Sequence, residues 1–140
     1  MNSNFGGAII NLSSITKICP CHQYQGYSAT KKYNNMLSNA ANYYFGKDID
    51  ILCVAPGYVS TKMTDFKEND AETCSPEEMS EGALRFLGRD EETNGPLRHS
   101  LFAIFYRFAC FLPPCISNII LPIALADPAA EPINVEKKQA

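Results

Sequence analysis

A tyrosine and a lysine stand four residues apart at the head of a predicted helix. The spacing of Tyr27 and Lys31 places a phenol and an ammonium group on one helix face, a single turn apart. A free phenol is a weak acid at neutral pH, but a cation about 5 Å away at an effective dielectric constant near 20 stabilises the phenolate by roughly 3 kcal/mol. We therefore predict that Tyr27 serves in general acid-base catalysis.

A serine precedes this pair at the end of a predicted strand. The hydroxyl of Ser14 would hold the carbonyl oxygen of a substrate beside the phenol of Tyr27. The three side chains together describe carbonyl reduction with proton donation. Because no side chain can supply a hydride, this chemistry requires a nicotinamide cofactor.

The elements that must position these residues form a βαβ unit. Residues 8–14 predict a strand buried on both faces, and residues 49–55 predict a second one that closes at Pro56 and Gly57. Between them, apolar residues recur at helical spacing, and we expect this stripe to supply core and subunit contacts. The members of the stripe are Ala29, Tyr33, Met36, Leu37, Ala40, Ala41 and Tyr44. A right-handed crossover would bring both strand ends to one edge of the sheet, where α/β proteins bind ligands.

Two further segments follow the βαβ unit. Residues 63–73 are polar and predict a loop. The sequence Ser75-Pro76-Glu77-Glu78 has the cap residue, the proline and the early carboxylates of a helix start, and this helix is predicted to end near residue 88.

Three ordered motifs carry a resemblance to a known family. Residues 11–14 (NLSS), 27–31 (YSATK) and 56–63 (PGYVSTKM) resemble consecutive signatures of the short-chain dehydrogenase/reductase family. Within it, the chain is most similar to the branch of 17β-hydroxysteroid dehydrogenases and very-long-chain 3-oxoacyl-CoA reductases. The resemblance implies an α/β fold, the C-terminal half of a Rossmann-type doubly wound parallel sheet.

The resemblance also implies a role for each matching residue. Ser14 would polarise the substrate carbonyl, Tyr27 would donate the proton, and Lys31 would support the phenol and bind the nicotinamide ribose. The residues implied to line the nicotinamide pocket are Pro56, Gly57, Val59 and Thr61. NADP(H) is the implied cofactor, and a 3-oxoacyl-CoA or a 17-ketosteroid is the implied substrate.

The family's glycine-rich phosphate loop and its catalytic asparagine belong upstream of residue 1 of this sequence. We therefore expect the chain alone to bind NADP(H) weakly. The alternative hypothesis is a truncated or inactive fragment that acts at most as a membrane-associated interaction protein.

Composition limits the other classes of function. A chain of 140 residues with a net charge of −3 is one domain at most, and it is not expected to bind nucleic acid. Cys19 and Cys21 have no second pair at metal-ligand spacing, so no metal site is predicted. His22 and His99 are expected on the surface or in loops, and residues 90–92 are expected to form a solvated acidic turn.

The C-terminal region predicts an association with membranes. We divide the chain into a partial reductase domain (residues 1–100), an apolar segment (101–126) and a polar tail (127–140). Because Pro113 and Pro114 interrupt the apolar segment, we expect it to insert into one leaflet, the alternative being a helix that covers the sheet or a substrate tunnel. Lys137 and Lys138 resemble a dilysine signal, which predicts that the protein is located on the cytosolic face of the endoplasmic reticulum membrane.

The family resemblance also suggests a homodimer, formed through the helix of residues 27–47.

Overall fold

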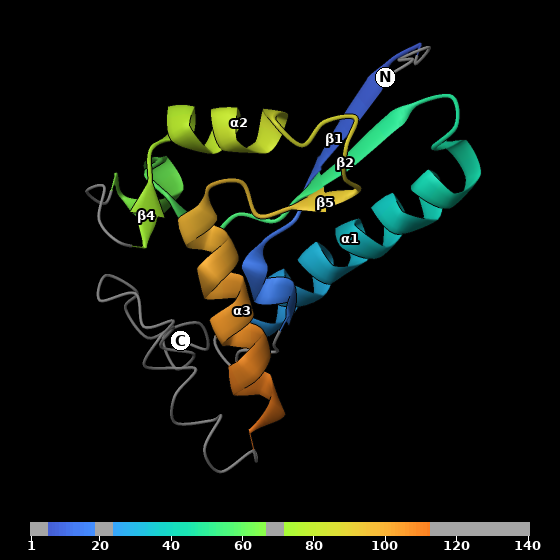
Figure 1. Ribbon diagram of the computed structural model, residues 1–140. Coiled ribbons are helices and arrows are strands. Elements are labelled where there is room, and N and C mark those ends of the chain that lie inside the picture. Colours follow the sequence, from blue (N-terminus) through green and yellow to red (C-terminus); the bar gives the residue numbers. More distant parts are fainter. Residues whose placement is uncertain (1–5, 19–23, 67–71, 113–140) are drawn as a thin grey trace, which may run out of the picture.

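The computed structural model describes residues 6–18, 24–66 and 72–112 (Figure 1). The elements in chain order are β1 (Ala8–Leu12), the 3-10 helix η1 (Ile15–Ile18), α1 (Gln25–Phe45), β2 (Asp50–Val54), β3 (Tyr58–Val59), the 3-10 helix η2 (Lys62–Thr64), β4 (Thr73–Cys74), α2 (Pro76–Leu84), β5 (Glu92–Thr93) and α3 (Leu97–Phe111). The alternation of strands and helices confirms the predicted α/β class.

A three-stranded parallel sheet in the order β1-β2-β5 forms the centre of the fold. β1 pairs with β2 from Ala8 opposite Asp50 to Leu12 opposite Val54. β5 joins the other edge of β2, while β3 and β4 form a separate parallel pair. Figure 1 shows α1 on one side of the sheet and α2 on the other. This two-sided cover is the arrangement expected of a partial Rossmann-like fold.

The central strand β2 is buried on both faces, as its apolar sequence predicts. Leu52 and Val54 pack with Met79 and Ala83 of α2 in one cluster. Cys53 lies on the opposite face, where its sulfur accepts a weak hydrogen bond from the amide of Asn35 on α1 at 3.6 Å. The continuous apolar run therefore reflects the alternation of side chains between two covered faces.

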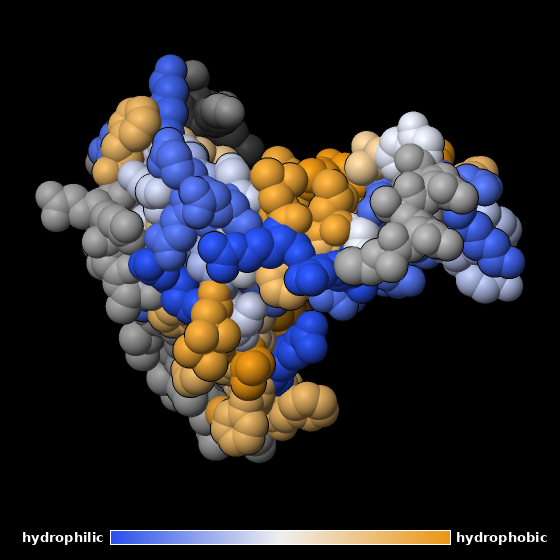
Figure 2. Space-filling view, turned by 45° about the horizontal axis from the view of Figure 1, so that its top comes forward, coloured by the Kyte–Doolittle hydropathy of each residue, from blue (hydrophilic) through white to orange (hydrophobic). Residues whose placement is uncertain are grey.

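The prediction that β1 is buried on both faces is wrong for the residues that the structure describes. Ile9, Ile10 and Leu12 have exposed fractions of 45%, 43% and 59%. β1 is the edge strand of the sheet, and α1 covers it only in part. Figure 2 shows that apolar side chains, in orange, are open to solvent on the face of the molecule that it displays.

The apolar stripe of α1 does not enter the core, so that part of its predicted role is wrong. Tyr33, Met36 and Tyr44 are exposed by more than half. The side of α1 that faces the sheet is polar instead, and its spacing of three and four residues is that of a helix face. Its members are Ser28, Lys31, Asn35, Ser38 and Asn42.

Hydrogen bonds explain why the polar side of α1 packs inward. The Asn42 amide donates to the carbonyl of Ile51 at 2.7 Å, and the Asn11 amide donates to the hydroxyl of Ser38 at 2.9 Å. These bonds join the helix to backbone and side chains of the sheet, which an apolar face could not do. Subunit contact through the exposed stripe stays a prediction.

The helix predicted after Ser75 is confirmed at its start. The Ser75 hydroxyl caps α2 by accepting the backbone N–H of Glu78 at 3.1 Å. α2 ends at Leu84, earlier than predicted, and the turns after it lead to Gly88, whose φ of 75° suits glycine. The predicted loop of residues 63–73 contains part of η2 and the start of β4, while residues 67–71 lie outside the described part.

Helix α3 packs beside the start of η1. Ala103, Tyr106 and Ala109 form a second apolar cluster with Ile15. None of the described helices has the length and apolarity needed to cross a membrane. Residues 113–140, with the predicted dilysine signal at Lys137 and Lys138, lie outside the described residues, as do Cys19, Cys21 and His22.

Candidate functional site

One cavity of about 570 Å³ brings together every residue predicted for the site. It opens where β1 and β2 end, between the start of α1 and the start of α2. The predicted residues that line it are Ser14, Tyr27, Lys31, Pro56, Gly57, Val59 and Thr61. Its size lies within the roughly 300–1,000 Å³ typical of small-molecule sites.

Tyr27 and Lys31 lie in the first two turns of α1. The Lys31 Nζ is 5.4 Å from the centre of the Tyr27 ring. The same nitrogen donates a hydrogen bond to the carbonyl of Leu12 at 3.2 Å, which draws the lysine toward the end of β1. An ammonium group has three N–H donors. The lysine can therefore hold this anchor and still donate to a ligand in the cavity.

Ser14 is the second residue after β1 and is only 7% exposed. Its Oγ accepts hydrogen bonds from the backbone N–H of Thr16 at 3.2 Å and from the Thr16 hydroxyl at 3.0 Å. Because these bonds use the acceptor capacity of the hydroxyl, its own hydrogen is left to donate. Thr16 also lines the cavity, and the sequence motif gave no signal for it.

A side chain next to Ser14 ties the end of β1 to the helix. The Ser13 hydroxyl donates to the backbone carbonyl of Lys31 at 2.7 Å. Since Ser13 is 2% exposed, little water competes for this bond. The bond sets the position of Ser14 relative to Tyr27 and Lys31.

The Pro56–Gly57 turn forms another wall of the cavity. The carbonyl of Pro56 accepts the backbone N–H of Ile15 at 3.0 Å. The N–H of Gly57 donates to Nδ1 of His99 at 3.2 Å. The expectation that His99 lies on the surface or in a loop is wrong, because His99 is fully buried near the start of α3.

The strand after this turn continues the wall. The Thr64 hydroxyl accepts the backbone N–H of Thr61 at 2.9 Å and donates to the carbonyl of Val59 at 2.7 Å. These bonds fold the chain at η2 so that Val59 and Thr61 both face the cavity.

A buried charge network lies behind the site. The Lys17 Nζ is 2.6 Å from one carboxylate oxygen of Glu92, and the Asn35 amide donates to the other at 2.7 Å. The prediction of a solvated acidic turn is therefore wrong for Glu92, which begins β5. Asp90 and Glu91 are exposed, as predicted. The network joins η1, α1 and β5.

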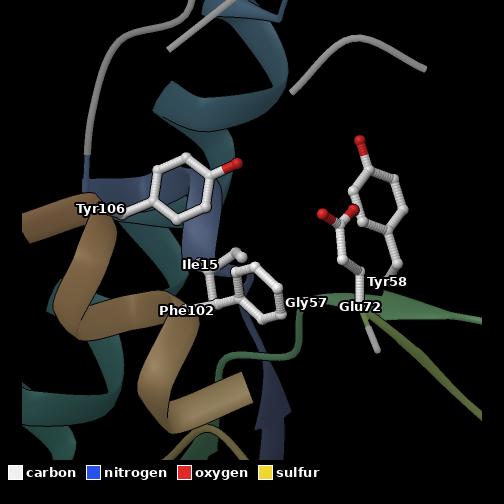
Figure 3. Close-up of a pocket in the computed structure, with 6 residues that line it drawn as sticks. All are labelled: Ile15, Gly57, Tyr58, Glu72, Phe102 and Tyr106. Carbon is white, nitrogen blue, oxygen red and sulfur yellow. The ribbon is translucent and has the colours of Figure 1, made fainter. Parts of the chain in front are cut away.

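A second, small pocket lies beside the Pro56–Gly57 turn. Its volume is about 10 Å³, room for one water at most. Figure 3 shows Phe102 and Tyr106 reaching it from α3, with Ile15 behind them and with Tyr58 and Glu72 on the other side. Ile15, Gly57 and Tyr58 also line the large cavity, so the two pockets share part of their walls.

The large cavity combines apolar walls with a few polar groups at one end. Leu12, Val59, Met63 and Met79 contribute apolar surface, and Lys31 is its one charged side chain among the described lining residues. Such a combination of apolar walls and a few polar groups is typical of small-molecule sites. Among the described residues there is no group of three or more His, Cys, Asp or Glu that could hold a metal ion.

Comparison with known proteins gives consistent results. A model of the short chain dehydrogenase family matches residues 1–72. A very-long-chain 3-oxoacyl-CoA reductase of Bos taurus is 35% identical over 98 residues, 69% of this chain and 31% of that protein. A 17-beta-hydroxysteroid dehydrogenase type 3 of Danio rerio is 35% identical over 96 residues, 68% of this chain and 31% of that protein. The chain spans about a third of the length of these curated relatives.

Proposed function

Because the chain belongs to the short-chain dehydrogenase family, which acts with a nicotinamide cofactor, we propose that its cavity is the catalytic half of an NADP(H)-dependent carbonyl reductase site. The observation that carries this proposal is the meeting of Ser14, Tyr27 and Lys31 in one cavity with the Pro56–Gly57 turn. Ser14, the Tyr27–Lys31 pair and the Pro56–Gly57 turn belong to three separate segments of the chain, which the fold brings together.

The chemistry follows from the hydrogen bonds of the site. A bound nicotinamide supplies the hydride that the carbonyl carbon receives. Ser14, whose acceptor positions are occupied by Thr16, donates its hydrogen to the carbonyl oxygen and polarises the bond. Tyr27 then delivers a proton to the same oxygen, which completes the alcohol.

Lys31 has two roles in this scheme. Its charge, 5.4 Å from the ring centre of Tyr27, stabilises the negative charge that develops on the phenol oxygen as the proton leaves. Its remaining N–H groups would bind the ribose hydroxyls of the cofactor. Gly57, Val59 and Thr61 would contact the nicotinamide from the opposite wall.

The substrate class is proposed from the relatives and from the cavity walls. The relatives are named for the reduction of very-long-chain 3-oxoacyl-CoA and for 17-beta-hydroxysteroids. Met63 and Met79 line the cavity, and their flexible, apolar side chains can adapt to an extended acyl chain. We therefore favour a 3-oxoacyl-CoA over a 17-ketosteroid as the substrate.

An association with the endoplasmic reticulum membrane, on its cytosolic face, is proposed through residues 101–126. The described start of this segment has an apolar face open to solvent: Leu101, Ile104 and Phe108 are each exposed by more than half. Such a helix face can lie in the interface of one leaflet. Binding of phospholipid vesicles should decrease in an Ile104→Ser, Phe108→Ser variant and persist in Tyr43→Ser, which removes an even more exposed aromatic residue from α1.

Titration of the whole chain with NADPH, followed by cofactor fluorescence, tests the proposed function. We expect weak but saturable binding and at least a tenfold higher Kd in Lys31→Ala. Lys32→Ala is the matched control, because Lys32 is the next residue on α1 and does not line the cavity. An equal effect of both substitutions, or no saturable binding by the wild-type chain, would contradict the proposal.

A further inference from the structure

A single peptide group in the wall of the cavity is held from both sides. The carbonyl of Pro56 accepts from the N–H of Ile15, and the N–H of Gly57 donates to Nδ1 of His99. These two groups belong to the same peptide bond. Ile15 directly follows Ser14, so the peptide connects His99 to the backbone beside the candidate catalytic serine.

The contact between Gly57 and His99 leaves little room for a side chain on the turn. A Cβ added at Gly57 would lie 3.0 Å from Cδ2 of the imidazole. His99 itself has no exposed surface, and α3 holds it by packing on η1 through Tyr106 and Ala103. The imidazole is thus a fixed support behind the turn and does not reach into the large cavity.

Only one protonation state of the imidazole can make this bond. Nδ1 must carry a lone pair to accept from Gly57, which excludes the imidazolium form. Burial lowers the pKa of His99 below its ordinary value of 6.5, by more than its interactions with the backbone of Glu72, Tyr58 and Asn94 raise it. The neutral form therefore prevails at neutral pH.

The charged and titratable groups around the imidazole are few among the described residues. Arg98 of α3 lowers the pKa of His99 through its positive charge, and Arg98 is itself paired with Glu78 of α2 at 2.6 Å. Glu72, before β4, and Tyr58 of β3 contact the imidazole through their backbone.

We infer that His99 is a positioning residue of the cofactor site, whose neutral imidazole fixes the Pro56–Gly57 peptide and so sets the distance between the nicotinamide wall and Ser14. This inference rests on the proposed function. It makes two predictions that a general structural role does not. The support depends on an acceptor at the Nδ1 position, and it is lost when the imidazole is protonated.

Two substitutions in the whole chain separate these effects. In His99→Asn, the side-chain oxygen stands as many bonds from Cα as Nδ1 does, and it accepts a hydrogen bond without titrating near neutral pH. His99→Leu retains apolar volume and removes the acceptor. Leu52→Val and Leu52→Ala serve as controls for lost stability, because Leu52 is fully buried and does not line the cavity.

Two measurements are needed, and only one of them involves the cofactor. At pH 7.5 the protection factor of the Gly57 amide against hydrogen exchange should fall at least tenfold in His99→Leu. In the wild type it should largely hold from pH 7.5 to pH 6.5 and fall only as the pH drops through the lowered pKa of His99. It should be high and independent of pH in His99→Asn. At pH 7.5 the Kd for NADPH should rise at least tenfold in His99→Leu and stay within threefold of wild type in His99→Asn and in both Leu52 variants.

The outcomes separate this inference from the proposed function. If His99→Leu loses the protection of Gly57 but binds NADPH as the wild type does, the positioning role is overturned and the proposed function stands. If Gly57 stays protected in His99→Leu, His99 does not hold the peptide. If the wild-type chain does not bind NADPH, the proposed function fails together with the cofactor role of His99, while the exchange data still decide whether the peptide is held.

Discussion

The ammonium group of Lys17 lies 2.6 Å from the carboxylate of Glu92, although the Lys17 side chain is only 4% exposed. Loss of Glu92 would leave a buried charge without its partner. We expect Glu92→Gln to lower the free energy of unfolding by about 2 kcal/mol, less than the roughly 3–5 kcal/mol of a fully buried pair, because Glu92 is still partly open to water. Urea denaturation measures this loss. The double variant Lys17→Met, Glu92→Gln should be more stable than Glu92→Gln alone.

The same pair predicts a dependence of stability on pH. Burial alone would raise the pKa of Glu92, but Lys17, Asn35 and Arg107 together lower it below the ordinary value of 4.5. A carboxyl with a lowered folded-state pKa contributes stability above its unfolded-state pKa and loses it as the pH falls through the folded-state value. The difference between wild type and Glu92→Gln should therefore shrink below about pH 4.5 and be largest near pH 7. A difference that grows in acid would contradict the ion pair.

Tyr27→Phe should slow carbonyl reduction by at least about 100-fold, the lower end of what a general acid contributes. Steady-state kinetics with NADPH and a 3-oxoacyl-CoA measure this effect. Tyr33→Phe removes the same hydroxyl from an exposed tyrosine on the same helix, and the rate should be unchanged. An equal loss in both variants would show that the helix, and not the phenol in the cavity, is responsible.

Thr16→Val should lower the rate of carbonyl reduction roughly tenfold, because Ser14 then loses one of the two bonds that direct its hydrogen toward the substrate. Thr16→Ser keeps the hydroxyl and should restore the rate. The affinity for NADPH serves as the second readout, and neither substitution should change it by more than about threefold. A rate that is the same in Thr16→Val and wild type would exclude this positioning role.

Asn42→Ala should lower the free energy of unfolding by about 1–2 kcal/mol, since it removes the donor to the carbonyl of Ile51. Asn39→Ala, on the exposed side of the same helix, should change it by less than about 0.5 kcal/mol. Thermal or urea denaturation of the two variants measures the difference. Equal effects would mean that the polar side of α1 does not hold the helix on the sheet.

The asparagines of α1 also show where sequence reasoning fails. The helix and both strands of the βαβ unit could be predicted, because helical spacing and buried strands leave clear patterns. Hydrophobicity could not predict which side of the helix faces the sheet, because that side is held by hydrogen bonds. Asn35, Ser38 and Asn42 each form a hydrogen bond with a residue of the sheet. An apolar stripe predicts burial only when an apolar partner exists to cover it.

The residues of the candidate site that belong to sequence motifs could be predicted, and the others could not. Ser14, Tyr27 and Lys31 were found from spacing and resemblance, and the cavity contains all three. His99 and Thr16 were missed because each acts through a single bond to a neighbour, and such a bond leaves no pattern in the sequence. A lone histidine gives no signal until the fold places a backbone donor against it.

The exposed edge of β1 has a consequence for how this chain behaves in concentrated solution. A strand at the edge of a sheet presents backbone groups in the geometry that another strand needs, and Ile9 and Ile10 add apolar side chains to that surface. A net charge of −3 over 140 residues gives little mutual repulsion between molecules. Self-assembly by strand addition would therefore compete with ligand binding, and a purified sample would aggregate faster as its concentration rises.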